Sequence, residues 1–333
     1  MDFLYIILFA FYGIYDILNK KIVIKRRTLL KKTDYFLGID GGGTKTVFRL
    51  TDANAQTIRQ TAKGASNPND IGFENAIALL KEGITETVGD IPYASVTMFA
   101  GISGGGLTGD YAQKLRHFFD EFGFFAFDNG SDIENIVALS EYAYAVLVIM
   151  GTGFIVYALG DDERKRIAGW GQLFDDGGCG YTIGRDAITA VLCASDGSGE
   201  PTILTALLTE RIGETAEAHL SEFYRGGKQY IASFAELVFK GAEKNDAVSL
   251  GILRKNMVFA AEKIKTGIRL LSKEEAIPVL FAGGISNWYE LLFPMIEGCL
   301  ADVKYRLIKI DCEPIEGALK RAQAIYKEKR EEK

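Results

Sequence analysis

The pattern of apolar and polar positions repeats one order of predicted elements in the two halves of the chain. In the first half a strand, a glycine-rich loop and two further strands are predicted at residues 35–39, 40–44, 46–50 and 56–61. The same order returns in the second half at residues 145–150, 151–153, 154–159 and 164–168. Gly151 follows Gly41 by 110 positions, so the pattern indicates an internal duplication.

Alternating helices and strands are predicted after each three-stranded segment. In the first half they are a helix at 75–88, a strand at 95–99, a helix at 111–122 and a strand at 124–127. In the second half a mostly helical stretch at 187–272 precedes a strand at 278–281, a helix at 288–300, a strand at 303–310 and a helix at 314–327. This order predicts an α/β protein with two mixed sheets, each covered by helices.

Composition limits the classes of function. The chain has 333 residues, 48% of them hydrophobic and 25% charged, and this length suits two core-forming units. A net charge of -6 and the lack of an arginine-rich or aromatic-interleaved stretch argue against nucleic acid as a partner. Four cysteines stand far apart without C-x-x-C spacing, which predicts a reducing cytoplasm rather than a disulfide framework or zinc site. The two histidines, His117 and His219, are expected on surface helices.

Residues 1–34 differ in composition from the rest of the chain. An apolar run at 3–15 is followed by a basic segment that ends at Lys32. The run is short for a membrane-spanning helix, and no signal-peptide cleavage site follows it. Two interpretations stay open: a membrane tether that leaves the following domain in the cytoplasm, or residues added by an upstream start site.

The glycine-rich loops are the candidate phosphate sites, because glycine lets the backbone approach phosphate closely. The order of residues at Gly43, Thr44 and Lys45 differs from that of a P-loop. A dinucleotide fingerprint would open a helix, whereas residues 46–50 have strand composition. Asp40 ends the first strand, where its carboxylate could hold magnesium, although Asp-Gly is also a common turn. The second loop at 151–153 favours the phosphate interpretation.

Four motifs, taken together, carry a resemblance to a known family. They are Phe36-Leu-Gly-Ile-Asp-Gly-Gly-Gly-Thr-Lys45, Gly151-Thr-Gly153, Gly169-Trp-Gly171 and Ala282-Gly-Gly284. In this order they resemble the N-acetylglucosamine kinase and BadF/BadG/BcrA/BcrD-type ATPase family, of the actin, hexokinase and Hsp70 fold superfamily. The resemblance implies two actin/hexokinase-like (ribonuclease H-like) domains, each with a mixed five-stranded sheet, and a nucleotide cleft between them. The implied domains are 35–145 with helix 313–330, and 146–312.

The resemblance also implies roles for individual residues. Asp40 matches the magnesium-associated carboxylate. The residues that match the two phosphate loops and the adenosine loop are Gly41, Gly42, Gly43, Thr44, Lys45, Gly151, Thr152, Gly153, Gly283 and Gly284. Those expected to contact the sugar are Asn67, Gly169, Trp170, Gly171, Asp175 and Asp176.

A phosphoryl transfer also needs a carboxylate that takes the proton of the attacking hydroxyl. Asp128 and Asp132 both follow the strand at 124–127, and the family's base stands nineteen positions before the second phosphate loop, as Asp132 does. We therefore expect Asp132 to be the base; its other interpretation is a helix N-cap. Two departures fall on the sugar side: Phe154 stands where the sugar kinases usually have Ser, and residues 175–179 read Asp-Asp-Gly-Gly-Cys instead of Gly-Asp-Glu-Gly-Ser.

The expected function is a cytoplasmic, ATP- and Mg²⁺-dependent kinase that phosphorylates a hydroxyl of N-acetylglucosamine, glucosamine or N-acetylmuramic acid. A homodimer is compatible with this expectation. One alternative is an ATPase that activates a 2-hydroxyacyl-CoA dehydratase or benzoyl-CoA reductase, which would share an iron–sulfur cluster across a dimer. For such a cluster the pair considered is Cys179 and Cys193, which stand fourteen positions apart. The other alternative is a non-catalytic sugar-binding protein.

Overall fold

The computed structural model describes residues 34–105, 110–140, 142–160, 164–175 and 177–331. Within these ranges the chain folds as two units, of which the first ends at Ala138 and resumes at Pro314. The second unit is Leu139–Glu313. The predicted extension at 1–34 lies almost entirely outside the described residues. Among the residues described, no helix has the length and apolar character needed to cross a bilayer.

The first unit is built on a mixed five-stranded sheet with the order β3-β2-β1-β4-β5. Its strands are β1 (Tyr35–Gly41), β2 (Thr46–Thr51), β3 (Thr57–Lys63), β4 (Val96–Ile102) and β5 (Ala126–Gly130). β1 pairs antiparallel with β2 and parallel with β4, so β1 is central. This position explains why β1 and β4 read as apolar runs, since both of their faces are covered.

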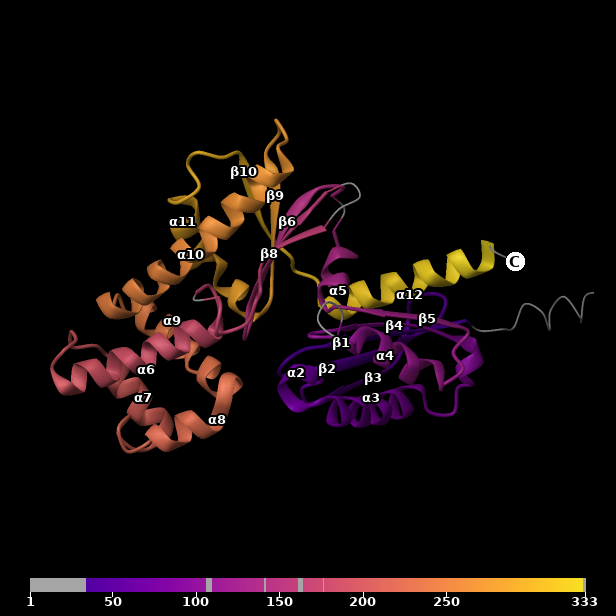
Figure 1. Cartoon of the computed structure of the whole chain (residues 1–333), viewed down its shortest axis with the longest axis horizontal. Coiled ribbons are helices and arrows are strands. Elements are labelled where there is room, and N and C mark those ends of the chain that lie inside the picture. Colours follow the sequence, from indigo (N-terminus) through magenta and orange to yellow (C-terminus); the bar gives the residue numbers. More distant parts are fainter. Residues whose placement is uncertain (1–33, 106–109, 141, 161–163, 176, 332–333) are drawn as a thin grey trace, which may run out of the picture. The chain divides into compact units, whose positions relative to one another are not determined.

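Helices cover both faces of this sheet (Figure 1). They are α2 (Pro68–Ile71), α3 (Phe73–Val88), α4 (Tyr111–Asp120), α5 (Ile133–Val137) and α12 (Pro314–Glu331), with a short 3-10 helix at Tyr93–Ser95. The apolar side of α3 packs against β2 and β3, and α12 packs on the opposite face against β1 and β4. The core on the α12 side contains Phe36 and Phe99 of the sheet, and Ile315, Ala318 and Leu319 of the helix.

Helix α12 contacts the rest of the first unit through two very close backbone approaches. A Cβ on Gly38 of β1 would lie only 3.1 Å from the backbone nitrogen of Leu319. A Cβ on Gly317 would overlap the carbonyl oxygen of Asn135 in α5. Because backbone atoms cannot move aside as a flexible side chain can, the absence of side chains at these positions lets α12 pack directly on β1 and α5.

The second unit repeats the sheet topology of the first. Its strands, in the order β10-β9-β6-β7-β8, are β6 (Ala145–Met150), β7 (Phe154–Leu159), β8 (Arg164–Ala168), β9 (Ile277–Ala282) and β10 (Tyr305–Lys309). β6 is antiparallel to β7 and parallel to β9, as β1 is to β2 and β4. The two predicted mixed five-stranded sheets flanked by helices are therefore confirmed.

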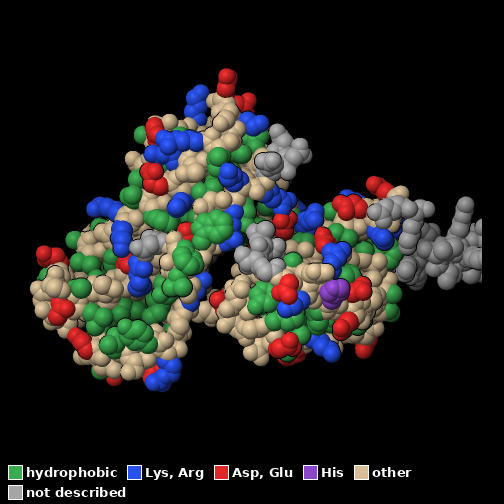
Figure 2. Space-filling model, in the orientation of Figure 1, with side chains coloured by type: hydrophobic (Ala, Val, Ile, Leu, Met, Phe, Trp, Pro, Cys, Tyr) green, Lys and Arg blue, Asp and Glu red, His purple; other side chains and the backbone are tan. Residues whose placement is uncertain are grey.

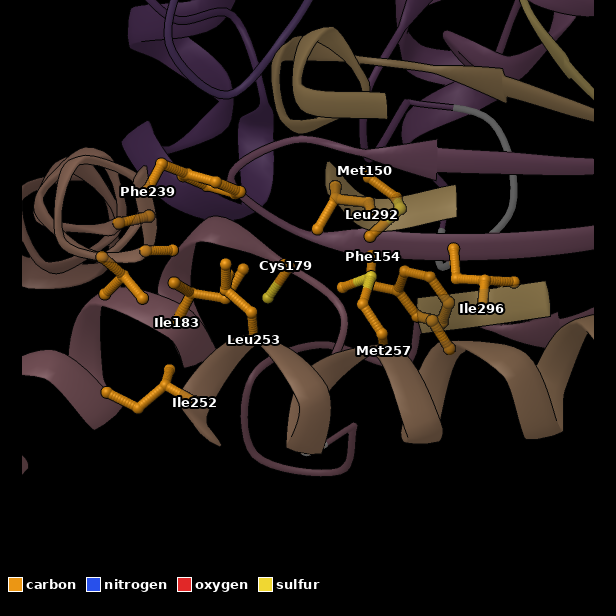
Figure 3. Close-up of a cluster of buried hydrophobic side chains, with 14 of the residues drawn as sticks. Met150, Phe154, Cys179, Ile183, Phe239, Ile252, Leu253, Met257, Leu292 and Ile296 are labelled. Carbon is orange, nitrogen blue, oxygen red and sulfur yellow. The ribbon is translucent and has the colours of Figure 1, made fainter. Parts of the chain in front are cut away.

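The helical stretch predicted at 187–272 consists of several helices in the structure. The helices of the second unit are α6 (Gly180–Asp196), α7 (Leu204–Ile212), α8 (Leu220–Ser233), α9 (Ala235–Glu243), α10 (Ala247–Leu271) and α11 (Tyr289–Glu297), with a 3-10 helix at Gly284–Trp288. Figure 3 shows part of the core that α6 and α10 form with the sheet. Figure 2 shows hydrophobic side chains also at the surface where α7 and α8 lie. Leu220 and Tyr224 of α8 are exposed.

Two local expectations differ from the structure. Strand β5 begins at Ala126, two residues after its predicted start, because Phe124 instead packs against Tyr93 and Phe122. His117 is exposed in α4 as expected. His219, however, precedes α8 and is largely buried, with Nδ1 2.7 Å from Oε1 of Glu214 and Nε2 2.7 Å from the Tyr230 hydroxyl.

We predict that Gly317→Ala lowers the free energy of unfolding by about 1–3 kcal/mol, because the added Cβ would meet a backbone carbonyl. Gly251→Ala is the matched control. It lies in α10 with open space around it and should raise stability by up to about 1 kcal/mol, since alanine favours a helix. Urea denaturation measures both changes. Equal changes for the two variants would contradict the proposed contact.

Candidate functional site

The first glycine loop (41–45) joins β1 to β2 and is held by neighbouring backbone. The amide of Gly42 donates to the carbonyl of Lys45 at 2.9 Å and closes the hairpin. The amide of Ser66 donates to Gly42 O at 3.1 Å, and that of Ser103 to Gly41 O at 2.7 Å. At the tip, Gly43 is half-buried, and Thr44 and Lys45 are exposed. The loop is therefore fixed at its base and accessible at its tip, as a backbone phosphate site requires.

Asp40 is positioned by a residue that sequence reasoning missed. The Nδ2 atom of Asn135 in α5 donates to Oδ1 of Asp40 at 2.7 Å. Asn135 is completely buried, and its Oδ1 has no hydrogen-bond partner among the described residues. A buried amide with an unpaired oxygen costs free energy, so its retention here points to a role in orienting Asp40. The one signal in the sequence is a pair of polar residues, Glu134 and Asn135, between Ile133 and Ile136.

Asp132 immediately precedes α5 and lies three residues before Asn135. Its carboxylate accepts hydrogen bonds from the Ser131 hydroxyl, at 2.9 Å, and from the backbone amide of Ile133, but it does not make the hydrogen bond of a side-chain cap. Part of its surface is exposed, yet protein atoms surround it densely, and this burial raises the pKa of Asp132. Hydrogen bonding by Ser131 and Ser103 acts in the opposite direction but is weaker. A carboxylate with a raised pKa is a better proton acceptor at neutral pH.

The other carboxylate considered, Asp128, is occupied by ion pairs. It lies within β5, where Oδ1 is 2.6 Å from the Arg116 guanidinium and Oδ2 is 4.0 Å from that of Arg321. These contacts join β5 to α4 and α12. The structure therefore separates the two aspartates: Asp128 ties elements of the first unit together, and Asp132 lies beside the glycine loop through Ser103.

Asn67 lies at the start of α2, next to the loop that follows β4. Its Oδ1 accepts from the amide of Asn69 at 3.0 Å, and its Nδ2 donates to Oδ2 of Asp70 at 2.8 Å. A Cβ on Gly104 would overlap the Asn67 side chain, so the two loops are in close contact. The Asn67 side chain thus caps α2. Its amide has one further donor and one further acceptor site, and the predicted sugar contact would have to use these.

The second glycine loop (151–153) lies between β6 and β7 and is held by the start of α6. The amide of Gly180 donates to Gly151 O at 2.8 Å, and that of Tyr181 donates to Thr152 O at 3.2 Å. The predicted adenosine loop is adjacent, since a Cβ on Gly283 would lie 2.5 Å from the carbonyl oxygen of Met150. Gly284, which follows, starts the 3-10 helix and faces open space. The structure therefore brings Gly151, Thr152, Gly153, Gly283 and Gly284 together at one end of the second sheet.

The predicted sugar-binding turn at Gly169, Trp170 and Gly171 is organised by Asp175. One carboxylate oxygen of Asp175 accepts from the amides of both Gly169, at 2.6 Å, and Trp170. Asp175 is only 7% exposed, whereas Trp170 is 55% exposed, with the Arg166 guanidinium 4.5 Å from its ring centre. Asp175 therefore holds the turn and Trp170 is presented outward. Asp176 lies outside the described residues.

The side chain of Phe154 lies in the hydrophobic core of the second unit, which the sequence did not reveal. Its ring is buried among Met150, Met257 and Leu292 (Figure 3) and lies 5.9 Å from the ring centre of Phe259. The side chain is therefore part of the core. Beside it, Oδ1 of buried Asn256 accepts from the Gly178 amide at 3.0 Å and from the Thr182 hydroxyl at 2.7 Å. Sequence reasoning also missed Asn256, which fixes the loop that replaces Gly-Asp-Glu-Gly-Ser.

Comparison with known proteins gives a consistent set of relatives. Residues 37–320 match the model of the BadF/BadG/BcrA/BcrD ATPase family. The chain is similar to N-acetyl-D-glucosamine kinase of Dictyostelium discoideum, with 29% identity over 86% of this chain and 96% of that protein. It is also similar to N-acetylmuramic acid/N-acetylglucosamine kinase of Clostridium acetobutylicum, with 30% identity over 83% of this chain and 93% of that protein.

A solved structure supports the fold assignment. It is described as a candidate N-acetylglucosamine kinase of Chromobacterium violaceum and matches with a TM-score of 0.70 and 23% identity. The match covers 88% of this chain and all of that one. The predicted resemblance and the actin/hexokinase-like fold are both confirmed.

The role of Asp175 can be tested by its removal. Asp175→Ala leaves two amide donors of the turn without their acceptor and should lower the free energy of unfolding by about 2–4 kcal/mol. The tryptophan emission of exposed Trp170 should shift at the same time. Asp175→Asn, which keeps one acceptor oxygen, is the matched control and should lose less than half as much. Equal losses for both variants would show that the turn does not depend on this acceptor.

Proposed function

Because the chain belongs to the BadF/BadG/BcrA/BcrD ATPase family, we propose that it transfers the γ-phosphate of ATP to a hydroxyl of an amino sugar. The acceptor is N-acetylglucosamine or a close relative, namely glucosamine or N-acetylmuramic acid. The named activities of the relatives from D. discoideum and C. acetobutylicum support this substrate class. One observation in the first unit carries the proposal. Ser103 contacts both the first glycine loop (41–45) and Asp132, the carboxylate whose pKa is raised by burial.

Ser103 joins the proposed base to the proposed phosphate loop. Its amide binds the carbonyl of Gly41, and its hydroxyl is hydrogen-bonded to Asp132. In the proposed reaction the sugar hydroxyl oxygen attacks the γ-phosphorus, Asp132 takes the hydroxyl proton, and ADP leaves. The protein contributes mainly orientation and charge stabilisation, as in other phosphoryl transfers.

Asp40 is the proposed contact for a magnesium ion that accompanies ATP. Magnesium is usually held by one or two carboxylates, with phosphate oxygens and water completing its shell. A single oriented carboxylate beside a glycine loop fits that requirement, and the Asn135 amide fixes its direction. The ion would neutralise phosphate charge. No group of three or more metal-ligating side chains occurs in the part of the chain that the structure describes.

The remaining proposed contacts come from the second unit and from Asn67 of the first. The backbone of the second glycine loop (151–153) binds phosphate, and Gly283 and Gly284 leave room for the adenosine. Asn67 of the first unit and the turn at Gly169, Trp170 and Gly171 contact the sugar. The exposed indole of Trp170 offers an apolar surface to one face of a sugar ring. Self-association and membrane contact through residues 1–34 stay predictions.

The geometry of Cys179 and Cys193 disfavours an iron–sulfur cluster held by this pair, as the activating-ATPase alternative would need. Cys179 immediately precedes α6, and Cys193 lies in the same helix fourteen positions later. At 1.5 Å per residue, the two are roughly 20 Å apart along the helix axis, too far to ligate one iron–sulfur cluster together. Cys179 is also buried beside the Thr182 hydroxyl. A binding protein without activity differs from the kinase in one measurement, the release of ADP when sugar is present.

A coupled ADP-release assay over amino sugars tests the proposed function. With ATP and magnesium, N-acetylglucosamine, glucosamine or N-acetylmuramic acid should increase ADP release well above the sugar-free rate. Asp132→Asn should lower kcat by about 10²–10⁴-fold, the usual contribution of a general base, while ATP affinity stays unchanged. Sugar binding without ADP release by the wild-type chain would favour the binding-protein alternative. Unchanged turnover in Asp132→Asn would reject the assigned base.

The pH dependence provides a separate test of Asp132. Burial raises its pKa above the ordinary value of 3.8, and the base works only when ionised. The kcat/KM should therefore fall on the acid side, with a midpoint above pH 3.8. Because its folded-state pKa is raised, ionised Asp132 also destabilises the fold as pH rises through that pKa. Asp132→Asn should therefore unfold at neutral pH no more easily than the wild type; a lower melting temperature would indicate a structural role instead.

A further inference from the structure

An amino group lies beside the second glycine loop (151–153), at a position that none of the motifs include. The Nζ atom of Lys228 is 3.6 Å from the point that a Cβ on Gly153 would occupy. Lys228 is half-buried, and within the described ranges no carboxylate forms an ion pair with it. The ammonium group of a half-buried lysine usually pairs with an acidic side chain or extends into water. Lys228 instead places its charge beside the second glycine loop.

The backbone around Lys228 is shaped to place it there. Helix α8 is interrupted at Gly227, whose φ of 66° and ψ of -166° lie outside the helical region and favour glycine. Lys228 is the first residue after this break. Across the break, the hydrogen bond between His219 and the Tyr230 hydroxyl joins the two parts of α8, and Phe223 packs against Phe234. The segment that begins with Lys228 is therefore held at a defined angle.

The same segment is packed against the helix that anchors the loop. A Cβ on Gly184 of α6 would overlap the carbonyl oxygen of Ile231. At Gly180, which donates its amide to Gly151, a Cβ would lie 3.2 Å from Gly151 O and 3.4 Å from Ala232 O. The glycine loop, the start of α6 and the segment containing Lys228 thus meet at Gly180. Because these approaches involve backbone, the loop and the backbone of the segment that begins with Lys228 are packed closely together within the second unit.

We propose that Lys228 is a catalytic residue that binds the β- or γ-phosphate of ATP at the second glycine loop. This inference rests on the proposed function, because it takes the loop to be a phosphate site. Loop amides direct hydrogen bonds to phosphate oxygens, and a lysine ammonium adds a point charge that amides cannot supply. The ammonium also offsets negative charge on the phosphoryl groups as the bond to the leaving ADP breaks. The transfer requires no additional reactant.

The length of the phosphate chain distinguishes this role from a structural one. In Lys228→Met, the affinity for ATP and ADP should fall by about tenfold or more, the usual effect of losing a charged hydrogen bond. The affinity for AMP should change by less than about twofold, since AMP lacks the outer phosphates. Lys228→Arg should retain most of the preference for ATP over AMP. Lys244→Met is the matched control: Lys244 is exposed in the same unit, and its replacement should change none of the affinities. Calorimetry with the full chain measures all of them.

A measurement on the wild-type chain keeps the proposal testable if Lys228→Met does not fold. Amine acetylation by a limiting amount of reagent, read by peptide mass spectrometry, should be slowed several-fold at Lys228 by ATP and ADP but not by AMP. Acetylation of Lys244 should be the same in all three nucleotides. Equal rates at Lys228 with ATP and AMP would overturn the proposal, as would equal losses of ATP and AMP affinity in Lys228→Met.

The outcomes separate this proposal from the proposed function. If the wild type phosphorylates an amino sugar and Lys228→Met has unchanged kcat and ATP affinity, the role of Lys228 is wrong and the kinase assignment stands. If the wild type binds ATP but phosphorylates none of the amino sugars, the proposed function fails. In that case the ATP, ADP and AMP affinities still decide whether Lys228 binds the outer phosphates.

Discussion

The candidate site of the first unit depends on the contact of α12 with β1 and α5. β1 carries Asp40, and α5 carries Asn135 with Asp132 at its start, so the relation between the two carboxylates is set by how these elements pack. Gly38 and Gly317 bring α12 against the backbone of both. A hydrogen bond of 2.7 Å between Asn135 and Asp40 tolerates little displacement. The helix that stabilises the fold therefore also sets the geometry of the proposed chemistry.

In the second unit, helices α6 and α8 hold the glycine loop in place. The loop is bound by two amides at the start of α6, and α6 in turn is packed against α8 through backbone contacts at Gly180 and Gly184. Lys228, whose side chain reaches this loop, is therefore carried by a helix that packs on α6. On the sugar side, Asp175 and Asn256 use their hydrogen bonds to shape loops. Asp175 and Asn256 therefore hold the loops in place, whereas the exposed Trp170 is the side chain that its turn presents outward.

Local pattern predicted the sheets because strand periodicity and glycine punctuation are properties of neighbouring residues. The predicted strands at 145–150, 154–159 and 164–168 coincide with β6, β7 and β8. Asn135 could not be assigned in this way, since its partner Asp40 is 95 positions away. Lys228 lies in a polar stretch, Arg-Gly-Gly-Lys-Gln, whose place beside the second glycine loop depends on the packing of α8 on α6. Likewise, the sequence showed an acid at Asp175 but not whether its carboxylate pointed into the turn or outward.

The discontinuity of the first unit has a consequence for how the molecule assembles during synthesis. Residues Leu139–Glu313 emerge from the ribosome as one uninterrupted segment and can bury their core as soon as they are complete. The first unit must wait for α12, and until then the face of its sheet around Phe36 and Phe99 has no helix to cover it. The earlier-translated half is thereby the later one to finish folding. During that interval its apolar face is open to chaperones, and to aggregation if they are absent.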